Sequence, residues 1–249
     1  MTQVMDTAVI LAAGLGSRLG DLKKDRPKAF LKVGEETLIE RSIRLLKQNG
    51  ITRIILGTGF GSIHFERLSE QHPEISTARN PIFANSGSMY TLYLLRELVN
   101  GPILLLEGDL LYEQAALEEL QSDPRQDIIL ASGQTDSGDE VYLQGSRSGL
   151  LENMSKDQSE LTHISGELVG ISKLSTEALE AMNRFAEKSY SHEDFQPHYE
   201  DALTSISRER ELSLKVVEHL LWCEIDDASH LRRAETLILP RIYQKENRN

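Results

Sequence analysis

Ala8-Val9-Ile10-Leu11-Ala12, followed by Ala13-Gly14-Leu15-Gly16-Ser17-Arg18-Leu19-Gly20, is the stretch that decides the fold. Five apolar residues that end at a glycine-rich loop predict a buried first strand, and the glycines allow a tight turn whose N–H groups can face phosphates. A dinucleotide fingerprint would need glycine at Leu19, and a Walker A loop would need Gly-Lys-Ser/Thr. A glycine pair alone fits an ordinary strand-to-loop turn equally well.

Outward from this loop, strand and helix patterns alternate along the chain. We expect helices over residues 38–48, 86–99, 176–188, 199–208 and from 228, and strands over 51–56, 103–106, 128–130, 214–217 and 220–225. This alternation predicts an α/β fold: a Rossmann-like, mostly parallel mixed sheet flanked by helices. No linker or repeat divides residues 1–249, so we expect a single domain. A Gly/Ser/Asp-rich stretch, 132–167, predicts a small hairpin-bearing lobe.

Composition limits the function classes. The net charge of −12 argues against nucleic acid or an anionic membrane as partner, because both require clustered Lys and Arg. No apolar run is long enough to span a bilayer and no signal layout precedes the first strand, so we expect a cytoplasmic protein. One cysteine, Cys223, cannot form an internal disulfide. Oligomeric state cannot be read from the sequence, and a homodimer is left open.

Two basic residues sharpen the interpretation of the glycine loop. Arg18 can offer its guanidinium to phosphate oxygens, and Pro27-Lys28 brings a lysine about ten residues later. With the loop they match the signature Leu-x-x-Gly-x-Gly-Ser/Thr-Arg followed by Pro-Lys. The chain therefore resembles the sugar-nucleotide pyrophosphorylase and cytidylyltransferase superfamily, along its whole length.

Further motifs narrow the resemblance. They are Asn80, 85–94 (NSGSMYTLYL), 137–142 (SGDEVY), 153–156 (NMSK), 166–174 (GELVGISKL) and 222–227 (WCEIDD). They look like the choline-phosphate and 2-aminoethylphosphonate cytidylyltransferases, and we favour the aminoethylphosphonate branch. The resemblance implies Mg²⁺-dependent transfer of CMP from CTP to a small phosphonate or phosphate, with a lobe for this acceptor over roughly 132–210. The alternatives are a choline-phosphate or sugar-1-phosphate enzyme and a catalytically silent nucleotide sensor.

Three acidic residues are the metal candidates. Asp109 and Asp226 each follow an apolar strand, and parallel strands collect such carboxylates at one edge of the sheet. Glu224 lies two residues before Asp226, so a regular strand would place both side chains on one face. Mg²⁺ suits them because it takes few carboxylates and completes its shell with phosphate and water oxygens. The simpler alternative, a helix N-cap, fits Asp227.

The resemblance also implies the binding roles. Arg18 would hold the pyrophosphate portion, Lys28 the α-phosphate and Lys156 the acceptor's phosphorus oxyanion. The nucleotide-binding candidates are Leu11, Ala13, Gly14, Gly16, Ser17, Asn80, Ser86, Gly87 and Ser88, although Ser86 also fits a helix N-cap.

The acceptor's amine is predicted from composition. Aromatic residues are 6% of the chain, and the stretch 132–167 contributes only Tyr142 to an aromatic cage. A primary ammonium, held by carboxylates, fits this supply better than a quaternary one. Asp139 and Glu167 are the candidates for that contact.

Overall fold

The computed structural model describes residues 5–22, 25–135, 137–138 and 140–247, and its centre is a nine-stranded mixed sheet. The sheet follows the order β10-β9-β11-β6-β1-β4-β5, and β8 joins it by pairing with β11 and β12. The strands are β1 (Thr7–Ala12), β4 (Arg53–Thr58), β5 (Ile75–Arg79), β6 (Ile103–Glu107), β8 (Ile128–Ser132), β9 (Tyr142–Gly145), β10 (Leu151–Ser155), β11 (Gly166–Leu174) and β12 (Ser213–Val217).

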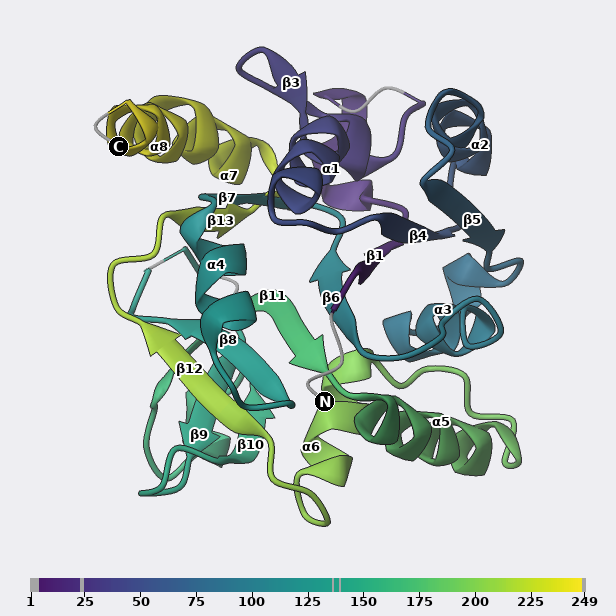
Figure 1. Cartoon of the computed structure of the whole chain (residues 1–249), viewed down its shortest axis with the longest axis vertical. Coiled ribbons are helices and arrows are strands. Elements are labelled where there is room, and N and C mark those ends of the chain that lie inside the picture. The colour runs from purple at the N-terminus through teal and green to yellow at the C-terminus, as the bar shows by residue number, and fades with distance from the viewer. Residues whose placement is uncertain (1–4, 23–24, 136, 139, 248–249) are drawn as a thin grey trace.

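Both faces of the sheet are covered by helices (Figure 1). Consecutive residues of β1 face opposite sides, so Ala8 and Ile10 pack with α1, α2 and α4, whereas Val9 and Leu11 pack with α3, α5 and α6. The helices are α1 (Leu38–Gln48), α2 (Ser62–Gln71), α3 (Ser88–Leu94), α4 (Ala115–Ser122), α5 (Thr176–Tyr190) and α6 (Tyr199–Ile206). At the C-terminal end, α7 (Ala228–Arg233) continues through a π-helical turn (Ala234–Ile238) into α8 (Leu239–Glu246).

Two small antiparallel pairs lie outside the large sheet. β7 (Leu110–Tyr112) pairs with β13 (Trp222–Glu224), and β2 (Lys32–Val33) pairs with β3 (Glu36–Thr37). The β7–β13 pair brings residues 222–224 beside the segment that follows β6. It packs against α7 and α8 through a third apolar cluster that includes Leu111, Cys223 and Ile242.

The α/β fold with a mostly parallel central sheet is confirmed, because β1, β4, β5 and β6 run parallel to one another. The helix expected over residues 38–48 has these bounds, since Thr37 forms a capping box with Glu40. The predicted elements omitted α2, β5 and β11. The helix expected over 86–99 is shorter, because α3 ends at Leu94.

The hairpin expected within residues 132–167 is formed by β9 and β10. It extends the large sheet, because β9 pairs with β11 through Gly166 and Glu167. No helix of the described ranges is long and apolar enough to cross a membrane.

Candidate active site

The glycine loop follows β1 and borders the end of β6. The N–H of Gly108 donates to the carbonyl of Leu11 at 2.9 Å, which fixes the two strand ends side by side. Gly16 has φ of +59°, and a Cβ there would lie 2.6 Å from Cγ of Lys28. Glycine at this position therefore serves two purposes: it allows the left-handed backbone and leaves room for the Lys28 side chain.

Lys28 lies between two of the predicted metal ligands. Its Nζ donates to Oδ2 of Asp109 at 2.9 Å and also to Oδ1 of Asp226. Arg18 donates to Oδ2 of Asp226 at 2.8 Å. Burial lowers the pKa of Lys28, but the Asp109 and Asp226 carboxylates outweigh burial and raise that pKa above its usual value. The lysine is therefore a permanent positive charge at this point.

Asp226 reaches the site by a different route from the predicted one. We expected a parallel sheet to collect both aspartates, but Asp226 follows β13 of the small antiparallel pair. The N–H of Ile225 donates to the carbonyl of Asp109 at 3.1 Å, which joins the two segments. The neighbouring Asp227 is the N-cap of α7, because it accepts hydrogen bonds from the N–H groups of Ser229 and His230.

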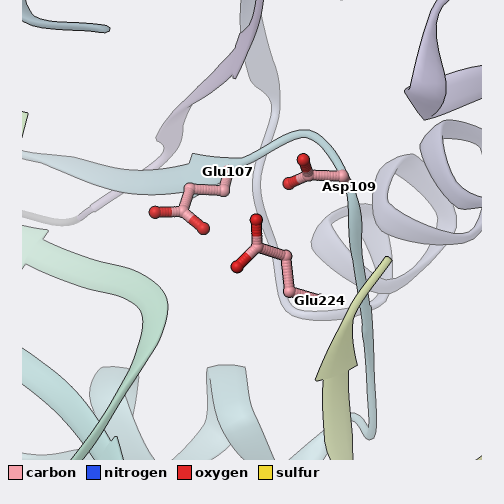
Figure 2. Close-up of side chains that lie close together, drawn as sticks. All are labelled: Glu107, Asp109 and Glu224. Carbon is pink, nitrogen blue, oxygen red and sulfur yellow. The ribbon is translucent and has the colours of Figure 1, made fainter. Parts of the chain in front are cut away.

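Three carboxylates converge where β6 ends beside β13 (Figure 2). Oxygens of Glu107, Asp109 and Glu224 lie within 4.8 Å of one another. Burial and the neighbouring carboxylates raise the pKa of Glu224 to about 10 and that of Glu107 to about 8. Such crowding disfavours three negative charges, so the cluster fits a divalent cation, which would offset them.

The cluster agrees only in part with the predicted metal ligands. It contains Asp109 and Glu224, whereas Asp226 is paired with Arg18 and Lys28. Glu107 was missed by the sequence reasoning. Glu107 lies two residues before Asp109, just as Glu224 lies two residues before Asp226. The same spacing argument would therefore have identified Glu107.

Two cavities meet at Leu11, Gly14 and Asp109. The smaller, of about 250 Å³, is the glycine-loop cavity; its lining includes Gly16, Ser17, Arg18, Lys28 and Asp226. The larger, of about 380 Å³, is the acidic cavity; its lining includes Ala13, Ser86, Gly87, Ser88, Glu107, Lys156, Tyr199, Glu200, Trp222 and Glu224. Among the predicted nucleotide-binding residues, all but Asn80 line one of the two.

Asn80 supports the cavity wall from behind. It is buried, and its amide donates to the hydroxyls of Ser86 at 2.9 Å and Thr91 at 3.0 Å. The N-cap of α3 is Gly87, so the alternative interpretation of Ser86 as the cap is wrong. A Cβ on Gly87 would lie 2.1 Å from the carbonyl oxygen of Pro197, so glycine is needed for close packing with that segment.

Of the residues predicted to bind the acceptor, the structure places one in the acidic cavity and one outside it. Lys156 lines the acidic cavity. Glu167 does not line it: the side chain is buried and its Oε2 accepts the N–H of Thr135 at 2.9 Å. Asp139 lies outside the described residues. Aromatic side chains reach the cavity from outside the 132–167 stretch, as Tyr199 of α6 and Trp222 of β13, so the composition count was incomplete.

The family follows from a sequence comparison. The model of the MobA-like NTP transferase domain matches residues 8–176, which run from β1 to the start of α5. The chain belongs to this family. This NTP transferase is therefore a nucleotidyltransferase, as the glycine loop and Lys28 predicted.

Two relatives extend over nearly the whole chain. The NTP transferase is 27% identical over 231 residues to 2-aminoethylphosphonate cytidylyltransferase of Lancefieldella rimae, covering 90% of this chain and 89% of the relative. It is 26% identical over 232 residues to choline-phosphate cytidylyltransferase of Streptococcus pneumoniae, covering 93% and 97%. The resemblance inferred from the motifs is confirmed.

Solved structures share the fold. CTP:phosphocholine cytidylyltransferase from Streptococcus pneumoniae superposes with a TM-score of 0.79 at 24% identity, over 92% of this chain and 97% of that one. The inositol-1-phosphate CTP transferase from T. maritima gives 0.81 at 18% identity, over 98% and 97%. These likenesses bear on the fold alone.

Proposed function

We propose that this NTP transferase is a Mg²⁺-dependent cytidylyltransferase that joins CTP and 2-aminoethylphosphonate, with release of pyrophosphate. The observation that carries the proposal is the position of Lys28, which lines the glycine-loop cavity and lies between Asp226 and Asp109, a residue that both cavities share. A nucleotide phosphate chain in the glycine-loop cavity and an acceptor in the acidic cavity would meet at this junction.

The chemical problem is the approach of two anions. The acceptor oxygen is already ionised near neutral pH, so the reaction needs no dedicated general base. Two unit charges 4 Å apart repel by about 4 kcal/mol at an effective dielectric constant of 20. Arg18 and Lys28 can offset charge on the triphosphate, and Lys28 is placed to stabilise the charge that develops at the α-phosphate.

A bound Mg²⁺ would neutralise further phosphate charge and orient the leaving group. Asp109, Glu224 and Glu107 would hold it, because their oxygens converge. Asp226, which the sequence predicts as a ligand together with Asp109, also contacts Lys28 and is a further candidate.

The acceptor is proposed from the cavity and the relatives together. Lys156 lines the acidic cavity and can bind a phosphorus oxyanion, whereas Glu200, which is not among the three carboxylates assigned to the metal, suits a cationic end. A relative that is 27% identical to this chain is named for 2-aminoethylphosphonate. Phosphocholine is the second candidate, because Tyr199 and Trp222 also line this cavity and aromatic faces attract quaternary ammonium groups.

The test is pyrophosphate release with CTP, UTP, ATP or GTP against 2-aminoethylphosphonate, phosphocholine, phosphoethanolamine and a sugar 1-phosphate. We expect the highest kcat/KM for CTP with 2-aminoethylphosphonate, and loss of activity in excess EDTA. A preference for phosphocholine would promote the second candidate, and full activity in EDTA would exclude the metal. The single domain, the homodimer and the absence of a nucleic-acid partner stay predictions.

A further inference from the structure

Glu200 contributes to the wall of the acidic cavity. It is the second residue of α6 and lines that cavity beside Tyr199. Its Oε2 is buried, and no residue of the described ranges donates a hydrogen bond to it. A buried carboxylate oxygen without a hydrogen bond is energetically costly, so a donor from a bound molecule would supply the missing hydrogen bond.

Three other glutamates of this region have donors from the protein. Oε1 of Glu107 accepts the hydroxyl of Tyr199 at 2.6 Å, and Oε2 of Glu167 accepts the N–H of Thr135. Oε1 of Glu140 accepts the N–H of Gly138 at 2.9 Å. Glu200 differs from these three glutamates, because its buried Oε2 has no donor among the described residues.

We propose that Glu200 accepts an N–H hydrogen bond from the ammonium group of the acceptor, and that it selects acceptors with a primary amine over quaternary ones. This inference rests on the proposed function, and it replaces Glu167 with Glu200 as the residue that contacts the amine. A primary ammonium has three N–H donors, whereas a quaternary ammonium has none and would leave Oε2 unpaired.

The cavity around Glu200 carries charges of both signs, which suits a zwitterion. Burial raises the pKa of Glu200 above its usual value, and a backbone hydrogen bond, His198 and, to a smaller extent, Lys156 oppose this rise. Lys156 and Glu200 both line the acidic cavity, so a ligand with a phosphonate at one end and an ammonium at the other would find a side chain of opposite charge for each. An ammonium at Oε2 would also favour the ionised carboxylate over the protonated form that burial promotes.

Binding calorimetry tests the inference without requiring turnover. The ligands are 2-aminoethylphosphonate, its N,N,N-trimethyl derivative and ethylphosphonate, each titrated with Mg²⁺ and the unreactive analogue α,β-methylene-CTP present or absent. The wild type should prefer the primary amine to both other ligands. Glu200→Gln should weaken binding of 2-aminoethylphosphonate by about 10- to 100-fold, the range for a charged hydrogen bond, and leave ethylphosphonate nearly unchanged.

The matched control is Glu209→Gln, which removes the same charge from an exposed residue that does not line the acidic cavity. It should bind all three ligands as the wild type does. Equal weakening of all three ligands by Glu200→Gln, or a wild type that prefers the trimethyl compound, would overturn the inference. Amine-selective binding that is lost in Glu200→Gln, without any transfer of CMP, would support it and count against the proposed function.

Discussion

The two cavities differ in how their charges are balanced. In the glycine-loop cavity, Arg18 and Lys28 lie against the carboxylates of Asp226 and Asp109, so positive and negative groups are paired within the protein. In the acidic cavity, carboxylates crowd together, and the pKa values of Glu107 and Glu224 are raised to about 8 and about 10. The first cavity can exchange its internal partners for phosphates. Under the proposed function, the second would receive cations from outside, as a metal ion and as an amine.

The largest expected effect comes from the residue that both cavities share. Asp109→Asn removes a carboxylate that contacts Lys28 and belongs to the acidic cluster. We expect turnover to fall by roughly 10³-fold, the scale of lost transition-state electrostatics, while the fold is retained. Pyrophosphate release and circular dichroism provide the measurements. Asp6→Asn, an exposed carboxylate before the opposite end of β1, is the control and should be fully active.

Removal of the Lys28 charge from the glycine-loop cavity should lower turnover rather than weaken CTP binding. Lys28→Ala is expected to lower kcat by roughly 10²-fold, because its charge matters most as negative charge develops around the α-phosphate. The KM for CTP should change much less. Steady-state kinetics with varied CTP decide the point. A variant with normal kcat and only a raised KM would make Lys28 a binding residue.

The same contrast explains what could be predicted from the sequence. The glycine-loop cavity is lined mostly by residues 11–18 and 28–29, which are close in sequence and contain a recognisable pattern, while Gly108, Asp109 and Asp226 reach it through tertiary packing. The acidic cavity combines β6, Lys156 after the end of β10, α6 and β13, whose proximity depends on tertiary packing. Tyr199, Glu200 and Trp222 therefore escaped the composition argument. Asp226 was found, but by the wrong route, because no local pattern distinguishes β13 from a strand of the large sheet.

A variant of the acidic cavity should separate the two substrates. Lys156→Ala is expected to raise the KM for the acceptor by about tenfold, because one charged contact to the phosphorus oxyanion is lost. The KM for CTP should stay near its wild-type value, since Lys156 does not line the glycine-loop cavity. Initial rates with each substrate varied in turn measure both constants. Equal changes in the two would contradict the division into two cavities.

The smallest effect concerns the two glycines of the loop. Gly16→Ala places a non-glycine residue at φ +59° and a Cβ 2.6 Å from Cγ of Lys28, which should cost about 1–2 kcal/mol of stability. Gly14→Ala is the matched comparison, because its Cβ would have no neighbour within 4 Å. Thermal unfolding should show a lower Tm for Gly16→Ala alone. Equal shifts in both variants would mean that neither the backbone conformation nor Lys28 requires glycine at 16.

Under the proposed function, a new bond forms between CMP and a phosphonate where the two cavities meet. Phosphorus-31 NMR of a mixture of enzyme, CTP, Mg²⁺ and 2-aminoethylphosphonate observes that bond directly. The proposed function predicts paired doublets from a P–O–P anhydride that links a phosphate to a phosphonate, together with an equal amount of pyrophosphate. Unchanged spectra of CTP and phosphonate, with an enzyme shown to be folded, would contradict it.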